Sequence, residues 1–214
     1  MTDNTLPYVS ELKDNFLRYV AVSSESDPKA GCVPSSEGQR ELARLLAEEL
    51  KALGLVEIEL NDHAILTALL PANVEGAPAV GWVAHLDTVP VSLSPDVQAQ
   101  VIRYEGGDVL LNAEKDIWVR LAEHPELAAY AGEDIVFTDG TSVLGADNKA
   151  AVANIMTMLS VVIRENRPHG DIRVAFVPDE EIGLCGSKLL DLEKFKVHFA
   201  YTCLLYTSPS PRDA

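Results

Sequence analysis

Residues 145–181, with the sequence GADNKAAVANIMTMLSVVIRENRPHGDIRVAFVPDEE, decide the fold because they place a helix directly before a buried strand. One helix face collects apolar residues at three- and four-residue spacing, namely Val152, Ile155, Met156, Leu159 and Ile163. Residues 172–177 form a short apolar run of the kind found in buried strands. This stretch therefore predicts a helix that lies against a sheet.

The alternation of helix and strand patterns continues on both sides of this stretch. Apolar spacing predicts a helix over residues 8–20 and a second one that begins with a capping box of Ser36 and Gln39 and stops at Gly54. Strands are expected at residues 56–60, 64–70, 79–84, 134–137 and 199–202, and a short helix at residues 187–195. This order indicates an α/β layered domain in which helices flank a largely parallel central sheet.

Residues 91–133 are less regular than the rest of the chain and suggest an excursion from the main sheet. A hairpin is expected around Gly106 and Gly107, because paired glycines favour a turn. A polar stretch at residues 121–130 is expected to be partly helical.

Composition excludes several classes of function. The chain of 214 residues contains 33 Asp and Glu against 17 Lys and Arg, a net charge of −16, which disfavours a nucleic-acid or anionic-membrane partner. No apolar run approaches the roughly 18 to 20 residues of a membrane span, and residues 1–5 lack the features of a signal peptide. Three cysteines without Cys-x-x-Cys spacing favour free thiols. We therefore expect a cytoplasmic protein; no sequence feature specifies an oligomeric state.

Three acidic or histidine-containing segments adjoin the ends of expected strands. His85 and Asp87 follow one strand, Asp147 opens the long helix, and Glu180 and Glu181 follow another strand. Because sites in open α/β sheets are built at the carboxyl ends of strands, these side chains are expected to converge in one crevice. Imidazole and carboxylates are the ligand set of a metal such as zinc.

The chemistry of each residue suggests a division of roles. Asp87 can orient His85 by accepting its second ring N–H, as is common behind metal ligands. Asp147, at a helix N-terminus, is favoured as a carboxylate with both oxygens free to bridge two cations. Neighbouring glutamates diverge on extended backbone, so one of Glu180 and Glu181 can bind metal while the other transfers a proton.

Three segments carry a specific family resemblance: residues 81–88 (GWVAHLDT), 138–150 (TDGTSVLGADNKA) and 169–183 (HGDIRVAFVPDEEIG). They closely resemble the peptidase T family, tripeptide aminopeptidases among the di-zinc exopeptidases related to aminoacylase. The likeness extends from about residue 6 to residue 202 and includes residues 33–38 (VPSSEG).

The resemblance implies a role for each candidate residue. His85 would bind one zinc ion, Glu181 the second, and Asp147 both, while Glu180 would be the general base and Asp87 would steer His85. It also implies a cis peptide bond between Asp147 and Asn148. The implied reaction removes the N-terminal residue of a short peptide substrate, a tripeptide, by means of a zinc-activated water.

The chain departs from the family pattern after residue 202. The family continues there with an aspartate zinc ligand, where this chain has Cys203 followed by a Ser/Pro-rich stretch. We therefore expect residues 1–202 to be a partial, truncated zinc-peptidase catalytic domain and residues 203–214 to be a tail foreign to the family, artefactual or disordered. With two protein ligands per zinc instead of the usual three, this fragment is expected to bind zinc weakly and to be inactive.

Two other functions remain open at this stage. The first is a different di-zinc amidohydrolase, a dipeptidase or an acylamino-acid hydrolase, which differs in its preferred substrate. The second is a non-catalytic α/β binding module that has kept the motifs. Zinc content and tripeptide hydrolysis separate an enzyme from such a module.

Overall fold

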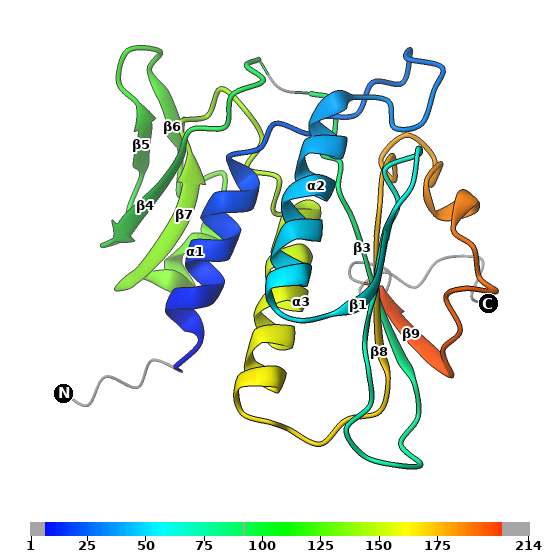
Figure 1. The fold of residues 1–214 in the computed structure, drawn as a ribbon. Helices are drawn as coiled ribbons and strands as arrows, with labels where there is room; N and C mark the ends of the chain where they lie inside the picture. The colour runs from blue at the N-terminus through cyan, green and yellow to red at the C-terminus, as the bar shows by residue number, and fades with distance from the viewer. Residues whose placement is uncertain (1–6, 92, 203–214) are drawn as a thin grey trace, which may run out of the picture.

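The computed structural model describes residues 7–91 and 93–202, and the tail predicted for residues 203–214 lies outside them. Its centre is a five-stranded sheet in the order β1-β2-β8-β3-β9. These strands are β1 (Val56–Leu60), β2 (Leu66–Leu70), β3 (Val80–His85), β8 (Ile172–Val177) and β9 (Phe199–Thr202). Figure 1 shows helices α1 (Val9–Val20), α2 (Glu37–Ala52) and α3 (Ala146–Arg164) gathered on one side of this sheet.

The sheet is mixed, and the parallel arrangement expected from the sequence holds for one half of it. Strand β3 pairs in parallel with both β8 and β9, whereas β2 is antiparallel to both β1 and β8. The short connection between β1 and β2 allows only an antiparallel pair, while the return from β3 to β8 runs through α3 and allows a parallel one. The parallel half is therefore the half that contains β3 and β8.

The core lies between the sheet and helices α2 and α3. Helix α2 buries Leu42, Leu46 and Leu50 completely, at the four-residue spacing that places them on one face. Full burial of each such side chain stabilises the fold by about 1.5 to 3 kcal/mol. Gly54 ends this helix as predicted: it has a φ of 86°, and the N–H of Leu55 bonds to the carbonyl of Leu50 at 3.1 Å.

The excursion from the main sheet that is expected at residues 91–133 is present, but its hairpin is not where the sequence predicts it. Strand β4 (Ala99–Tyr104) pairs with β7 (Glu133–Thr138), and β5 (Val109–Asn112) pairs with β6 (Ile117–Val119). The expected hairpin around Gly106 and Gly107 is thus wrong. Both glycines have positive φ, and the chain passes there from one two-stranded sheet to the other. A 3₁₀ helix, η1 (Pro125–Tyr130), follows, as the expected partial helicity suggests.

Two further expectations about helices are corrected. Ser36 is the N-cap of α2, but its side chain makes no capping bond, so the capping box does not form. The region expected as a helix at residues 187–195 contains only the 3₁₀ turn η2 (Ser187–Leu189). There the carboxylate of Asp191 accepts the backbone N–H groups of Glu193 and Lys194, a local turn that competes with helix.

Within the described residues, no helix combines the length and the apolar character that crossing a bilayer requires.

Candidate metal centre

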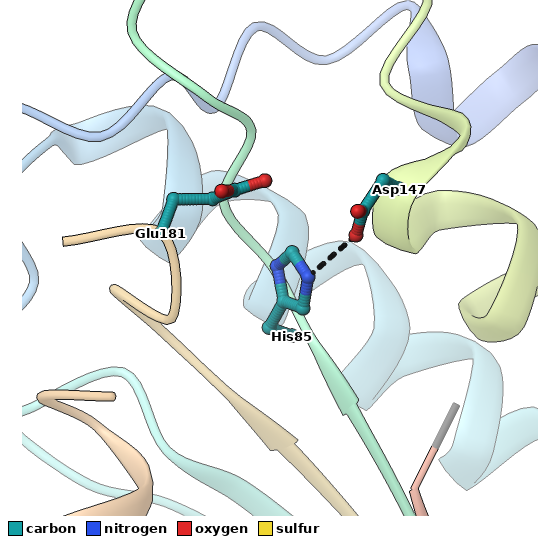
Figure 2. Close-up of side chains that lie close together, drawn as sticks. All are labelled: His85, Asp147 and Glu181. Atoms are coloured by element: carbon teal, nitrogen blue, oxygen red, sulfur yellow. Dashed lines mark hydrogen bonds and ion pairs between the residues drawn. The ribbon is translucent and has the colours of Figure 1, made fainter. Parts of the chain in front are cut away.

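The ends of two neighbouring parallel strands place the candidate residues together. His85 is the last residue of β3 and lies opposite Val177, the last residue of β8. Glu180 and Glu181 lie in the turn that follows β8, after Pro178 and Asp179, and Asp147 stands at the entry of α3. Figure 2 shows His85, Asp147 and Glu181 directed toward one common space.

The distances in this cluster fit a metal ion. His85, Asp147 and Glu181 each offer one ligand atom, and these atoms all lie within 4.8 Å of one another. His85 Nε2 is 2.9 Å from Asp147 Oδ1. His85 is only 4% exposed, whereas the Asp147 side chain is 56% exposed, so the cluster is anchored in the protein and open on one side. An imidazole with two carboxylates is a donor set suited to zinc.

Asp87 contacts both the His85 ring and the backbone of the two glutamates. Its side chain is fully buried, and its Oδ1 lies 3.2 Å from His85 Nδ1, while its carbonyl oxygen lies 3.0 Å from the same nitrogen. The carboxylate also accepts the backbone N–H of Glu180 at 2.9 Å and of Glu181 at 3.0 Å. Sequence reasoning expected only the first contact. The second joins backbone amides more than 90 positions away, for which the residue pattern contains no signal.

The backbone at Asp147 differs from the expected helix start. Asp147 and Asn148 have non-helical dihedral angles, so regular helix begins after Asn148 and Asp147 lies at the helix entry. The peptide bond between these two residues is cis, as the family resemblance implies.

The carboxylates and the imidazole shift one another's protonation. Burial disfavours the charged form of His85, but the neighbouring carboxylates, first among them Asp87, outweigh burial and raise its pKa. Burial also raises the pKa of the Glu181 carboxyl, and the charge of Asp147 adds to this effect. Glu180 Oε2 lies 3.8 Å from His85 Nε2, so Glu180 borders the same space as the three converging residues.

Lys149 places a buried ammonium behind the cluster. Its side chain is 1% exposed, and Nζ donates to the carbonyl of Val22 at 2.6 Å. Burial lowers its pKa to about 8, and the charge of Asp87 opposes this shift. Four carboxylates thus face one imidazole and one ammonium, an excess of negative charge that favours a bound cation.

Several known proteins are similar in sequence to this chain. No protein-family model matches it. Over 198 residues it is 54% identical to a peptidase T-like protein of Yersinia pestis, a match that covers 92% of this chain and 48% of that protein. The chain is a homologue of peptidase T. Peptidase T of Geobacillus thermodenitrificans is 45% identical over 195 residues, covering 90% of this chain and 47% of the relative.

The chain therefore spans about half the length of the peptidase T relatives that it matches. Among solved structures, aminopeptidase PepT of Bacillus cereus superposes with a TM-score of 0.64 at 25% identity, covering 90% of this chain and 42% of that one. An M20 family metallo-carboxypeptidase of Sulfolobus solfataricus superposes with a TM-score of 0.56 at 18% identity, covering 90% and 36%. The second match shows a shared fold.

Proposed function

We propose that residues 1–202 form part of the catalytic domain of a zinc-dependent aminopeptidase that removes the N-terminal residue from short peptides, tripeptides among them. One observation carries most weight: His85, Asp147 and Glu181 converge at the strand ends of a peptidase T homologue, with Glu180 beside them. We further propose that the reaction takes place in the cytoplasm, in keeping with the acidic composition.

The cluster of His85, Asp147 and Glu181 supports the proposal that metal is bound here, and we propose two zinc ions that would share the Asp147 carboxylate. His85 and Asp147 would hold the first ion, and Asp147 and Glu181 the second. The exposed Asp147 side chain leaves its oxygens accessible for this shared role, and the buried His85 is held from behind by Asp87. When bound, zinc would make a water molecule more acidic and polarise the peptide carbonyl.

The imidazole of His85 is prepared for metal binding by its partner. If Asp87 accepts the Nδ1–H, through its carbonyl or its carboxylate, the remaining nitrogen, Nε2, presents its lone pair toward Asp147 and the open side. The same carboxylate fixes the backbone of the two glutamates. Asp87 therefore sets the relative position of ligands that come from β3 and from the turn after β8.

Glu180 is suited to the proton transfers of hydrolysis. Its side chain is 39% exposed and borders the cluster without being one of the three residues whose ligand atoms converge. A carboxylate in this position can take a proton from the attacking water and later deliver it to the departing amine. Such a group contributes typically about 10² to 10⁴ in rate.

Activity is best tested in a chimera, because this chain spans about half of its relatives. Residues 1–202 would be joined to the part of the Yersinia pestis relative that the chain does not match, and tripeptide hydrolysis measured beside hydrolysis of acylated amino acids. We expect tripeptides to be preferred, and Glu180→Gln in the same chimera to lower the rate by about 10² or more while retaining zinc.

Two results would contradict this function. Faster hydrolysis of acylated amino acids than of tripeptides would favour the acylamino-acid hydrolase. Loss of zinc and of activity to the same extent in Glu180→Gln would remove Glu180 from the role of general base. The 214-residue chain itself is expected to bind zinc only weakly, because each ion would have two protein ligands among the described residues.

A further inference from the structure

A second buried carboxylate stands directly before the two glutamates of the cluster. Asp179 is fully buried, and the described part of the chain places no cationic side chain within ion-pair distance of it. Its oxygens instead accept the backbone N–H of Ser35 at 2.8 Å, the hydroxyl of Ser35 at 2.5 Å and the amide of Gln39 at 2.7 Å. A buried carboxylate is tolerated only when it is satisfied in this way.

Gln39 forms two hydrogen bonds with Asp179. Its Nε2 donates to the Asp179 carboxylate, and its Oε1 accepts the backbone N–H of Asp179 at 2.9 Å. Gln39 is itself fully buried and lies in the first turn of α2. The capping box expected at Ser36 and Gln39 would need Gln39 Oε1 as acceptor, but this oxygen accepts the N–H of Asp179, 140 positions away, while Nε2 also donates to the Ser36 hydroxyl at 3.1 Å.

The backbone at Asp179 adopts an uncommon conformation. Its φ of 57° lies in the left-handed region, which is uncommon for residues other than glycine, although aspartate and asparagine enter it more readily than most. Cys185 N–H bonds to the Asp179 carbonyl at 2.9 Å, and Gly186 N–H bonds to the Pro178 carbonyl at 3.0 Å, which closes the turn. A Cβ at Gly186 would stand 2.3 Å from the Pro178 oxygen, so the turn has no room for a side chain there.

Glu180 and Glu181 are thus held from two sides. Asp87, at the end of β3, accepts both of their backbone N–H groups, and Asp179, the preceding residue, is bound to the start of α2. The two carboxylates together fix where the glutamate side chains leave the backbone. A displacement of about 1 Å in such a supporting contact is enough to impair a metal or catalytic site.

We propose that Asp179 and Gln39 are a positioning pair that sets the placement of Glu180 and Glu181 in the metal cluster. The effect on metal binding rests on the function proposed above, whereas the effect on the turn does not. An ordinary core residue stabilises the whole fold, whereas this pair acts on the one turn that follows β8.

A swap of hydrogen-bonding roles tests the pair. Asp179→Asn keeps the size of the side chain and tolerates a positive φ, but its amide group opposes one of the present donors. Gln39→Glu sets one carboxylate against another at the 2.7 Å contact. In the double variant Asp179→Asn/Gln39→Glu, the amide of residue 179 can donate to the carboxylate of residue 39, which restores a complementary contact.

Two measurements on the 214-residue chain read out the result. Hydrogen exchange followed by NMR reports on the amides of Glu180 and Glu181 without metal, and titration with Zn²⁺ alone reports on the cluster. We expect each single variant to speed exchange of these two amides at least tenfold and to weaken Zn²⁺ binding about tenfold, the lower end for partners behind metal ligands. The double variant is expected to recover most of both losses.

Leu50→Ala is the matched control, because Leu50 is fully buried in the same helix, α2, and among the described residues no hydrogen bond links it to the turn after β8. It should lower the midpoint of urea unfolding while leaving Zn²⁺ affinity within twofold. The positioning pair is refuted if Asp179→Asn behaves as this control does, or if the double variant recovers neither quantity.

Zn²⁺ binding and amide exchange test the metal site and the positioning pair separately. If the unmodified chain and His85→Ala take up Zn²⁺ equally, the metal site itself is wrong, and the exchange of the Glu180 and Glu181 amides then decides the pair alone. Accelerated exchange that is rescued in the double variant supports it; unchanged exchange overturns it.

Discussion

The two strands that flank β3 differ sharply, although both run parallel to it. Strand β8 is paired on both sides and nearly all of its residues are buried, and the turn that follows it contributes Asp179, Glu180 and Glu181. Within the part of the chain that the structure describes, strand β9 is paired on one side, and all four of its residues are exposed. Its last described pair is Val83 with Thr202, two positions short of His85. Among the described residues, the cluster is therefore built from the end of β3, from the turn after β8 on one flank of β3, and from α3.

The largest contrast between the flanks is expected in packing. Phe176 in β8 is fully buried, whereas Tyr201 in β9 is 53% exposed and stacks on Trp82. Phe176→Ala should lower the free energy of unfolding by about 3 to 5 kcal/mol. Tyr201→Ala should lower it by about 1 kcal/mol or less. Urea denaturation of both variants measures the difference, and equal losses would mean that the two flanks are equally well packed.

The next contrast is between two carboxylates, Asp87 and Asp191, each of which accepts two consecutive backbone N–H groups. Asp87→Ala leaves the N–H groups of Glu180 and Glu181 without their acceptor and should cost about 2 to 3 kcal/mol. Asp191 accepts the amides of Glu193 and Lys194 before β9, but it is exposed. Because water replaces a lost exposed bond, Asp191→Ala should cost about 1 kcal/mol or less. Thermal and urea unfolding of the pair would expose any reversal of this order.

A finer comparison lies within the turn after β8, between adjacent glutamates. Glu181 belongs to the converging ligand set and Glu180 does not. Glu181→Gln should weaken Zn²⁺ binding at least about tenfold, or 1.4 kcal/mol, and Glu180→Gln should change it much less. Calorimetric titration with Zn²⁺ gives both values. A larger loss in Glu180→Gln would exchange the two assignments.

The smallest effect is expected from the ammonium behind the cluster. The pKa of Lys149 is lowered to about 8 by burial, so above that pH the folded chain holds fewer protons at this site than the unfolded chain. This site's contribution to stability therefore rises with pH, by about 1 kcal/mol between pH 8 and 9. Comparison with Lys149→Met isolates it, since that variant should lack this rise; parallel pH profiles would contradict the assignment.

Local patterns account for most elements of the fold. The spacing of Leu42, Leu46 and Leu50 predicts α2, and Gly54 ends that helix where its left-handed backbone is needed. The apolar run at residues 172–177 corresponds to β8 without change. These predictions succeed because helix faces, helix ends and buried strands are specified by residues close together in the chain.

Contacts between distant segments account for what the sequence did not predict. Pairing of β4 with β7 across the intervening hairpin depends on which strands meet in space, and the turn at Gly106 and Gly107 does not reveal it. Ser36 stands three positions before Gln39, so the pair predicts a capping box; in the structure Gln39 bonds to the Ser36 hydroxyl but also forms two hydrogen bonds with the distant Asp179. The convergence of His85, Asp147 and Glu181 was predictable, since each adjoins a strand end or a helix start, and so was the contact of Asp87 with His85. The hydrogen bonds between Asp87 and the backbone of the two glutamates were not.

The register of β3 against β8 also constrains how a chain of this kind can vary in length. His85 stands opposite Val177, the last residue of β8, so this register sets where the turn that carries Glu180 and Glu181 leaves the sheet relative to His85. Gain or loss of one residue inside either strand would turn the following side chains to the opposite face of the sheet. Length variation compatible with the cluster is therefore confined to connections such as residues 165–171, between α3 and β8, where an added residue leaves this pairing intact.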